Sequence, residues 1–457
     1  MIRDISILKK QLIFKKDIYF IQMSLFHMIA LIKQVSNFVG EEVTVRGWLY
    51  NFRCSGKIAF LELRDGSGFL QAVASKEEVG EEMFDTIGKL TQESSIIVTG
   101  TIVAHPKQEG VFEMQVSNIK VVQIAQEYPI TKKEHGPDFL LNNRHLWLRS
   151  KKQWAIQRVR DVVIMAMYEY YHSLEYIKID TPIITPNACE DATELFEIEY
   201  FDEGKAFLSQ SGQLYLEAAV MSVGRAFDFG PTFRAEKSKT RRHLTEFWML
   251  DAEAAYVEHE ENMKIQENLI CFVVKRCLEH CATELAILER DLEPLKKIQA
   301  PFIRLTYTEA IDKLQQLGSD IRFGDDLGND DEGLLTQNEE VPVFIHKWPK
   351  KIKPFYMKTD PENPDLVLNN DLIGIEGAGE IIGGSQREDD YDILKARIQE
   401  MGFVGEEYEW YLDLRKYGSV PHSGYGVGLE RVVRWICGVE HIRETIPYPR
   451  MISRLKP

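Results

Sequence analysis

The chain lacks a long, uninterrupted apolar run of the kind that crosses a membrane as a helix. The mostly apolar stretch at 18–32 is 15 residues long, and Gln22, Ser24 and His27 interrupt it. A membrane-spanning helix needs about 20 apolar residues. No cleavage site of small residues follows the stretch, so we expect neither membrane insertion nor export.

Cysteine is also scarce, which excludes a disulfide framework. The six cysteines lie mostly isolated in apolar sequence: Cys54, Cys189, Cys271, Cys277, Cys281 and Cys437. Such thiols are typical of a reduced, cytoplasmic protein. In CFVVKRCLEHC, Cys277, His280 and Cys281 could present metal ligands on adjacent helical turns, but no second ligand pair accompanies them. The segment therefore predicts a half-buried helix with small apolar thiols.

Positive charge is in deficit. Lysine and arginine number 55 against 71 acidic residues, a net charge of −16, so a polyanion would have to be met by a local basic patch. Residues 1–60 contain nine basic and four acidic residues, 9 − 4 = +5, and could supply one. With 44% hydrophobic and 28% charged residues, the composition excludes wholesale disorder and predicts an ordinary globular protein.

Short alternating runs begin at Glu42 and predict a small barrel. The runs are VTVRGWLYNF, IAFLELRD, FLQAVAS, SSIIVTGTIVAH and FEMQVSNIKVVQI, separated by turn residues. Five short strands at this spacing predict an OB-type Greek-key β-barrel at residues 38–126, a class that presents a sheet face to oligonucleotides. We assign no function to residues 1–37.

A larger domain is predicted after a hinge at residues 127–150, which mix proline, glycine and charge. Lys151 to Leu174 has helical periodicity, and an extended run follows. The strand-like segments after it are AFLSQ, DFGPTFRAE, EFWMLDAEAAY, PVFIHKWP, FYMKTD, EIIGGSQR and HSGYGVG, and helical segments lie at 211–227, 260–290 and 389–401. Because strands outnumber helical crossovers, we expect an α+β fold, with a mostly antiparallel sheet flanked by helices in residues 151–457.

An acidic segment interrupts this domain. Residues 318–340 contain eight acids and one base, and few large apolar residues. This composition predicts a solvated insertion or a mobile loop.

The segment FRAEKSKTRRHLTEF, residues 233–247, combines features of a phosphate and base site. Arg234 and Glu236 lie two apart on a predicted strand, hence on one sheet face, and Phe247 can return to that face on the next strand. An arginine can clamp a phosphate, and a glutamate can accept the exocyclic amine of a base. An exposed, ion-paired hairpin is the alternative interpretation.

The segment HSGYGVGLERVV places glycines before Arg431 at the start of a predicted helix. Gly418, Gly424, Gly426 and Gly428 would let the backbone approach a ligand, and the guanidinium could stack on an aromatic base. The segment does not match the dinucleotide-binding fingerprint, because no βαβ unit surrounds it.

Together with YIKIDTPIITP around Pro182, these two segments resemble, in the correct order, the three signature motifs of class II aminoacyl-tRNA synthetases. With the barrel segment VRGWLYNFRCSGKIAFLELRDGSGFLQAV, the chain is similar to the aspartyl, asparaginyl and lysyl subgroup over residues 38–457, and SQSGQLYLEAA and GEIIGGSQRE are most similar to its asparaginyl members. The resemblance implies an enzyme that activates L-asparagine with ATP and Mg²⁺ and transfers it to tRNA(Asn). It also implies a homodimer with Pro182 near the two-fold axis.

The resemblance gives single residues a role toward ATP. Arg234 would hold the α-phosphate and the amino-acid carboxylate, and Phe247 and Arg431 would sandwich the adenine. The other residues assigned to ATP are Glu236 at the adenine amine, Arg242 and His243 at the outer phosphates, and Gly428. Catalysis, assigned to Arg234, His243 and Arg431, would then need no protein nucleophile.

The same resemblance places Mg²⁺ at Glu380, together with Asp371. The spacing between these two acids is one residue longer than is usual in the asparaginyl enzymes, so Glu376 is a substitute ligand for Asp371.

The amino-acid pocket is assigned from Ser211-Gly212-Gln213. Aspartyl members carry a lysine three residues after the glutamine, whose charge pairs with the substrate carboxylate, whereas this chain has Leu216. Losing that cation while keeping Arg387 fits a neutral amide, because the guanidinium can donate to the amide oxygen.

The remaining pocket residues follow from the same resemblance. Glu217 or Glu190 would accept the amide NH₂, and Asp251 would meet the α-ammonium. Arg415 is either a pocket residue or a surface residue that faces tRNA. On the barrel, Phe60 and Gln71 match positions that stack on and hydrogen-bond the central anticodon base.

Three alternatives remain open from the sequence. The first is an aspartyl-type enzyme, including one that charges two tRNAs, against which Leu216 argues. The second is a synthetase-like enzyme that makes free asparagine, which usually lacks the barrel. The third is a catalytically silent RNA-binding paralogue, against which the intact Arg234, His243, Glu380 and Arg431 argue.

Overall fold

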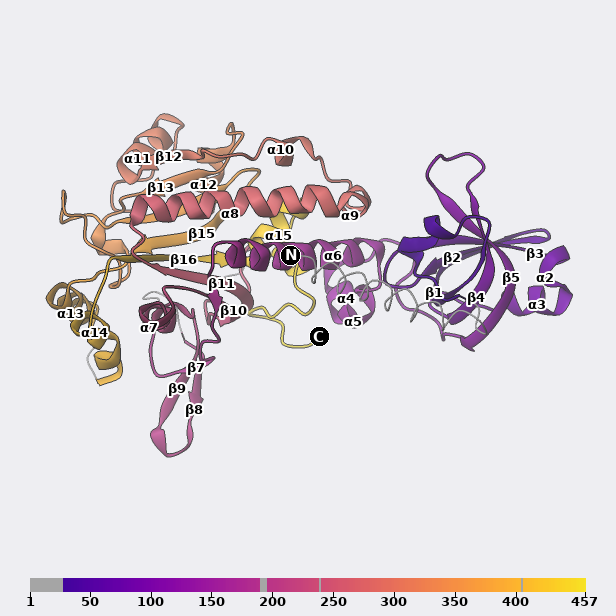
Figure 1. Ribbon diagram of the computed structural model, residues 1–457, viewed down its shortest axis with the longest axis horizontal. Helices are drawn as coiled ribbons and strands as arrows, with labels where there is room; N and C mark the ends of the chain where they lie inside the picture. Colours follow the sequence, from indigo (N-terminus) through magenta and orange to yellow (C-terminus); the bar gives the residue numbers. More distant parts are fainter. Residues whose placement is uncertain (1–27, 190–194, 238–239, 404–405) are drawn as a thin grey trace, which may run out of the picture. The chain divides into compact units, whose positions relative to one another are not determined.

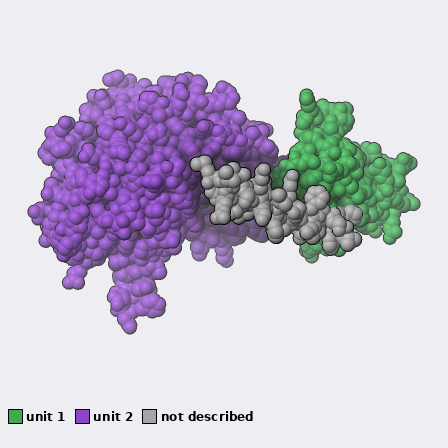
Figure 2. Space-filling model, viewed as in Figure 1, with its two compact units in different colours: residues 1–135 green, residues 136–457 purple. Residues whose placement is uncertain are grey.

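The computed structural model describes residues 28–189, 195–237, 240–403 and 406–457. The chain divides into two compact units, residues 1–135 and 136–457, shown in green and purple in Figure 2. The division falls inside the segment interpreted as a hinge. Most of the N-terminal extension lies outside the described residues. None of the helices in the described part combines the length and apolar character that a membrane crossing requires.

The first unit is built around a closed barrel. Its strands are β1 (Glu42–Ser55), β2 (Ile58–Arg64), β3 (Phe69–Ser75), β4 (Ser95–Ala104) and β5 (Phe112–Gln123). They are ordered β1-β2-β3-β5-β4, and β3 and β5 are parallel. The short helices of this unit are η1 (Ile32–Phe38), α2 (Lys76–Val79) and α3 (Glu81–Ile87). The predicted OB-type barrel is confirmed.

Alternation along the strands builds the barrel core. Ala59, Leu61 and Leu63 of β2 are buried and alternate with outward-facing side chains. Residues two apart share one face of a strand, so this period places the apolar set inside. Leu70 and Ala72 on β3 continue the same core.

A buried ion pair closes one end of β2. The Arg64 guanidinium donates to both Glu93 carboxylate oxygens at 2.8 Å, and the two side chains are 6% and 2% exposed. Both charges are therefore removed from water, and each depends on the other for compensation.

The second unit contains an eight-stranded sheet (Figure 1). Its strands, in spatial order, are β12 (Ile303–Thr306), β13 (Val343–His346), β14 (Asn369–Gly374), β15 (Gly379–Gln386), β16 (His422–Gly428), β11 (Glu246–Ala255), β10 (Arg225–Phe233) and β6 (Ile177–Lys178). The β12–β13 and β10–β6 pairs are parallel, and the pairs between them are antiparallel. The expected mostly antiparallel sheet is confirmed.

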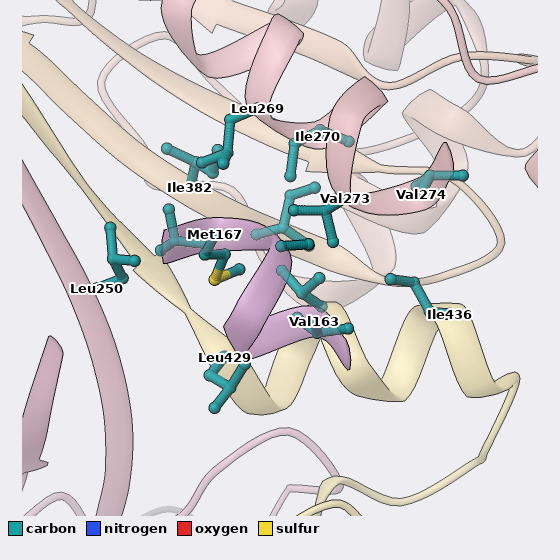
Figure 3. Packing of buried hydrophobic residues seen from close by; sticks show 14 of the residues in the cluster. Val163, Met167, Leu250, Leu269, Ile270, Val273, Val274, Ile382, Leu429 and Ile436 are labelled. Atoms are coloured by element: carbon teal, nitrogen blue, oxygen red, sulfur yellow. The ribbon is translucent and has the colours of Figure 1, made fainter. Parts of the chain in front are cut away.

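Among the helices that pack against this sheet, α6 (Lys151–Ser173), α8 (His259–His280) and α15 (Leu429–Cys437) form the main core with it. Val163 and Met167 of α6 meet Leu269 of α8, Leu250 of β11 and Ile436 of α15 in the main core, as Figure 3 shows. Cys277 and Cys281 are buried in the same core as free thiols, so the interpretation of this segment as an apolar helix face is confirmed. Among the described residues, no group of three or more histidine, cysteine or acidic side chains is placed to hold a metal ion.

The remaining elements surround the sheet. A second sheet of three strands contains β7 (Ile184–Thr185), β9 (Lys205–Leu208) and β8 (Glu197–Glu199). The other helices are α4 (Pro137–Asn142), α5 (Arg144–Trp147), η2 (Phe201–Glu203), α7 (Gln213–Val223), α9 (Ala282–Ile287), α10 (Glu293–Lys296), α11 (Tyr307–Gln316), α12 (Asn329–Thr336), η3 (Lys350–Ile352), α13 (Tyr391–Glu400), η4 (Glu406–Tyr408), α14 (Glu409–Lys416) and η5 (Ile442–Glu444).

Two predicted features need correction. The acidic segment 318–340 is exposed over much of its length, as a solvated insertion would be, but it is no loop throughout, because it contains α12, whose Leu335 and Thr336 are buried. Asp331 caps the start of this helix and so satisfies free backbone groups. The segment FYMKTD forms isolated bridges at Met357 and Thr359 instead of a strand.

The Arg64–Glu93 pair yields a stability prediction. Replacing Arg64 with alanine removes the guanidinium that binds the buried Glu93 carboxylate, and we expect the barrel to lose about 3 kcal/mol of stability. Hydrogen exchange of β1–β5 peptides in the full chain should therefore become faster, with little change in the second unit. Lys57→Ala, which removes an exposed pair with Glu77, is the control and should change little. Unchanged exchange in Arg64→Ala would contradict the prediction.

Candidate active site

A cavity of about 320 Å³ lies in the second unit, over the strands at the middle of the sheet. The sequence-predicted residues that line it are Ser211, Gln213, Arg234, Glu236, Arg242, His243, Phe247, Asp251, Asp371, Glu380, Arg387, Gly428 and Arg431. Residues spread over more than 200 positions of the sequence therefore share one site. Glu217 and Arg415 are buried and do not line the cavity, and Glu190 lies outside the described residues.

The hairpin β10–β11 supplies the first cation. β10 ends at Phe233, one residue before Arg234, but the Arg234 amide still donates to the Thr245 carbonyl at 3.0 Å. The guanidinium lies 5.3 Å from the centre of the Phe247 ring. Its Nε atom is buried and has no hydrogen-bond partner among the described residues. A buried unsatisfied donor is costly, so a ligand that accepts from it would be bound favourably.

Glu236 and His243 face each other across the loop of this hairpin. The His243 Nε2 atom lies 3.5 Å from the Glu236 carboxylate, and its ring also contacts Thr240. Burial, and then the charges of Arg431, Arg234 and Arg242, lower the pKa of His243, although Glu236 opposes them. Before an anionic ligand binds, the imidazole ring is therefore mostly neutral at pH 7, because the three neighbouring arginines disfavour a further positive charge.

Arg431 is the third residue of α15, which follows β16 directly. Its Nη1 atom donates to the Glu380 carbonyl at 2.5 Å and lies 3.6 Å from the Glu380 carboxylate. The Glu380 side chain is 40% exposed, so its carboxylate remains accessible from the cavity. An accessible carboxylate beside the Arg431 guanidinium suits a ligand that carries phosphate groups together with a metal ion.

Asp371 and Glu380 converge above Gly383. A Cβ atom on Gly383 would lie 2.9 Å from the Glu380 carboxylate and 3.9 Å from that of Asp371, so only glycine leaves this space open. Lys353 binds the other Asp371 oxygen at 2.7 Å. Burial and the Glu380 charge raise the pKa of Asp371 to about 7 against the effect of Lys353. Two carboxylates with an open cradle between them fit a hard divalent cation that takes its other ligands from phosphate and water.

Glu376 does not substitute for Asp371 as a metal ligand. Its carboxylate pairs with the Arg290 guanidinium at 2.8 Å, and it does not line the cavity. Glu376 lies in the turn between β14 and β15, with φ +55°. The direction of this turn carries its side chain away from Glu380, so that expectation is wrong.

Asp251 lies at the other end of the cavity, where α7 begins. It accepts hydrogen bonds from the Gly212 amide at 2.8 Å and the Ser211 hydroxyl at 3.1 Å. Burial raises its pKa to about 6, although these donors and Arg387 favour the charged form. At neutral pH the site therefore offers a carboxylate with two fixed donors and room for a cationic ligand group.

A buried ionic network lies directly behind this end. The Arg387 Nε atom donates to Glu253 at 3.1 Å, and the Arg415 Nη2 atom donates to Glu217 at 2.7 Å. Glu217 also accepts from Tyr411 at 2.8 Å, from His422 at 3.1 Å and from Gln213 at 3.2 Å. Burial opposes its charge, but Arg415, His422 and Arg387 hold the pKa of Glu217 well below its usual range.

This network corrects two expectations. Arg415 is buried and bonded to the Glu388 carbonyl at 2.8 Å, so the surface or tRNA-facing alternative is wrong. The glycines of β16 were expected to let the backbone approach a ligand, but they also leave space for buried acids. Gly424 leaves space for the Glu253 carboxylate, and a Cβ on Gly426 would lie 2.9 Å from the Asp251 carboxylate. Each glycine is the cross-strand neighbour of the acid that it accommodates.

Comparison with known proteins agrees with this geometry. The family model described as tRNA synthetases class II (D, K and N) matches residues 136–452, and the model of an OB-fold nucleic acid binding domain matches residues 43–122. The asparagine–tRNA ligase of Pelotomaculum thermopropionicum is 52% identical over 427 residues, which are 93% of this chain and 99% of that protein. This chain belongs to the asparagine–tRNA ligases of class II.

Solved structures of class II synthetases agree. The chain is similar to asparaginyl-tRNA synthetase from Pyrococcus horikoshii complexed with asparaginyl-adenylate, with a TM-score of 0.90, 44% identity, and 95% of this chain and 100% of that chain covered. It is also similar to asparaginyl-tRNA synthetase from Entamoeba histolytica, with a TM-score of 0.85, 34% identity, and 94% and 100% covered. The predicted resemblance to the asparaginyl branch is confirmed.

In this class II synthetase, Leu216 does not face the substrate cavity. It is fully buried and packs with Val220 and Ala226 in an apolar cluster. The sequence argument from the missing lysine reached the correct branch. In the described pocket, the feature relevant to a neutral substrate is that Arg387 and Arg415 are paired with Glu253 and Glu217.

The predicted anticodon residues of the synthetase lie together on the outer barrel face. Phe60 on β2 is half-buried, with the Arg53 guanidinium 4.5 Å from its ring centre. Gln71 on β3 donates to Glu113 at 3.2 Å. Both side chains alternate with core residues, so both point outward.

Pro182 lies on an exposed apolar edge of the synthetase's second unit. It lines a smaller cavity of about 210 Å³ that also reaches Asp251. Nearby Ile177, Ile183 and Ile184 are 49%, 45% and 44% exposed, and β6 is the edge strand of the sheet.

Sequence reasoning missed two charged residues of the synthetase site. Lys353 lines the cavity, is buried against Trp348 and pairs with Asp371. Its segment, KWPKKIKPF, has the composition of a solvated surface, and no motif singled it out. Glu332 binds Arg242 at 2.6 Å and comes from the acidic segment that was interpreted as a loop.

The buried network yields the second prediction. Glu217→Gln keeps the shape but leaves the Arg415 charge unpaired, and we expect the free energy of unfolding to fall by about 3 kcal/mol at pH 7. A carboxyl whose pKa is depressed by folding stabilises the protein above its unfolded pKa of about 4.3, and this contribution disappears as the pH falls. The difference from wild type should therefore shrink in acid. Urea denaturation measures it, with the exposed Glu400→Gln as control, and equal midpoints at pH 7 would contradict the prediction.

Proposed function

We propose that this chain is an asparagine–tRNA ligase, which activates L-asparagine with ATP and transfers the asparaginyl group to tRNA(Asn). The observation that carries this proposal is the charge balance behind the amino-acid end of the cavity. Each arginine there has a glutamate at ion-pair distance, Glu253 for Arg387 and Glu217 for Arg415. Burial raises the pKa of Glu253, and the Arg387 charge opposes this shift. A neutral amide adds no charge to such a pocket, whereas an aspartate carboxylate would add one that has no partner.

Activation requires the positioning of two anions. The asparagine carboxylate oxygen attacks the α-phosphorus of ATP, the bond to the β-phosphate oxygen breaks, and pyrophosphate leaves. We assign the α-phosphate to Arg234, whose buried Nε lacks a partner, and the outer phosphates to Arg242 and His243. Fixed cations where negative charge collects lower the barrier without a protein nucleophile.

The adenine is assigned to the space between Phe247 and Arg431. An aromatic ring and a guanidinium both stack on a base, and Glu236 can accept the adenine amine. Gly428, which precedes α15, leaves the base access to the backbone. All four residues line the cavity.

The amino-acid end is assigned by charge and donor count. Asp251 would bind the α-ammonium, with Ser211 and the Gly212 amide holding its carboxylate in place. Arg387 and Gln213 would meet the side-chain amide, and Glu217 would act through them, since it binds Gln213 at 3.2 Å. Glu190 remains a prediction outside the described residues.

Mg²⁺ is assigned to Glu380 and the free oxygen of Asp371, above Gly383. When bound there, the ion would neutralise phosphate charge. Lys353 occupies the other Asp371 oxygen and would add a second positive charge at the same end.

Transfer and assembly complete the proposal. The terminal ribose hydroxyl of tRNA attacks the carbonyl carbon of the adenylate, and AMP leaves. We assign the anticodon to the outward Phe60 and Gln71, and the dimer interface to the exposed apolar edge around Pro182. The free cysteines fit a reducing compartment, and we place the enzyme in the cytoplasm.

ATP–pyrophosphate exchange tests the function. With Mg²⁺ and without tRNA, we expect exchange with asparagine and at least about 100-fold less with aspartate, because an unpaired charge in the pocket is costly. Charging of tRNA(Asn) should follow in the same preparation. Equal exchange with aspartate would overturn the pocket assignment. Exchange with neither amino acid would favour a silent RNA-binding paralogue.

The raised pKa of Asp251 yields a pH prediction. Because burial raises this pKa to about 6, the carboxylate that would bind the α-ammonium is charged above pH 6 and neutral below it. We expect the KM for asparagine in the exchange assay to rise up to about tenfold per pH unit below that point. A KM for asparagine that stays constant to about pH 5 would contradict the assignment.

A further inference from the structure

Arg242 is held by residues that lie far from it in the sequence. Its Nη1 atom donates to the Glu332 carboxylate at 2.6 Å and to Asn329 at 2.8 Å, both on α12. Its Nη2 atom donates to the Gly377 carbonyl at 2.9 Å, in the turn between β14 and β15. Three acceptors from two elements therefore fix the plane of one guanidinium that lines the cavity.

The Arg242–Glu332 pair is sheltered from water. Both side chains are 14% exposed, so the pair is screened far less than a surface ion pair. Gly379, with φ +77°, packs on it, and a Cβ there would lie 2.8 Å from the Glu332 carboxylate. α12 also packs against β14 and β15 (Figure 1), so Glu332 is carried by a helix anchored to the sheet.

The same turn is bound by a second arginine. The Arg434 Nη2 atom donates to the Gly377 carbonyl at 2.9 Å. One carbonyl thus connects Arg242 to α15, which carries Arg431, and the turn leads directly into Glu380. These hydrogen bonds therefore fix the position of Arg242 relative to Arg431 and Glu380, which line the same cavity.

We propose that Glu332 is a positioning residue for the triphosphate: it holds Arg242 in the orientation that binds the outer phosphates of ATP and the leaving pyrophosphate. This inference rests on the proposed function, because it takes ATP as the ligand of Arg242. An arginine that is fixed before its ligand arrives loses less side-chain entropy on binding, and this gain appears as affinity. Glu332 and Asn329 accept from Nη1 and the Gly377 carbonyl accepts from Nη2. Of the five guanidinium donors, the Nε hydrogen and the second Nη2 hydrogen are not used by these three acceptors and could bind phosphate.

The substrates separate this role from a general structural one. Outer phosphates take part in activation and in its reverse, but they are absent from the transfer of asparagine from adenylate to tRNA. A positioning residue for the triphosphate must therefore change the KM values for ATP and pyrophosphate and spare the other steps.

The experiment compares Glu332→Gln with wild type and Asp330→Asn. The control removes one charge from the same helix at an exposed position. For Glu332→Gln we expect the KM for ATP and for pyrophosphate in the exchange assay to rise about tenfold. The KM for asparagine and the single-turnover rate of transfer from preformed asparaginyl-adenylate to tRNA should stay within about twofold of wild type.

A second variant tests geometry against charge. Glu332→Asp keeps the carboxylate but shortens its reach, and we expect a KM for ATP between those of wild type and Glu332→Gln. An unchanged KM for ATP in Glu332→Gln would overturn the proposal, and so would an equal loss in transfer. A lower KM would also overturn it, because Glu332 would then compete with the triphosphate for Arg242. Absence of asparagine-dependent exchange in wild type would instead refute the proposed function.

Discussion

Two arginines and two glutamates that are removed from water set the geometry of the amino-acid end. Arg387 and Glu253 are 2% and 1% exposed, and Arg415 and Glu217 are not exposed at all. Each buried ion costs several kcal/mol unless a partner lies at hydrogen-bond distance. The segments that carry them are β11, α7, α14 and the residue directly after β15, and they can therefore meet only where all four charges are compensated. Gln213 and Asp251 lie next to these anchored groups, so their positions depend on the same compensation.

The glycines of the central strands follow from this constraint. A sheet that carries acids on β11 must leave space for them on the neighbouring strand, and Gly424 and Gly426 provide it opposite Glu253 and Asp251. Gly383 on β15 is the cross-strand neighbour of Asp371 on β14 and also leaves space for Glu380 of its own strand. In a strand interior, glycine costs order and packing, so its repeated use here indicates that space for charge outweighs strand propensity.

The sequence predicted those parts whose signal is local. Alternation located the barrel, and helical periodicity located α6. Motifs predicted that Arg234 and Arg431 lie together, and both line one cavity. β14 was missed because NNDLIG lacks alternation and begins with three polar residues, yet all of it is buried. Asn370 tolerates this burial because it donates to Gln266 of α8 at 2.6 Å, a partner 104 positions away. Lys353 and Glu332 were missed for the same reason, since each has the composition of a surface residue until its partner is known.

The two ends of the cavity solve opposite problems. The ATP end must receive several negative charges, and it presents Arg234, Arg242 and Arg431 around an accessible Glu380. The amino-acid end must distinguish an amide from a carboxylate of nearly the same shape, so only charge and hydrogen-bond donors can separate them. If the cations there had no partners, either substrate would be attracted, and aspartate more strongly. In the proposed assignment, Glu253 and Glu217 are the partners of these arginines, so an incoming carboxylate would find less positive charge than at unpaired arginines, and a neutral side chain would be favoured.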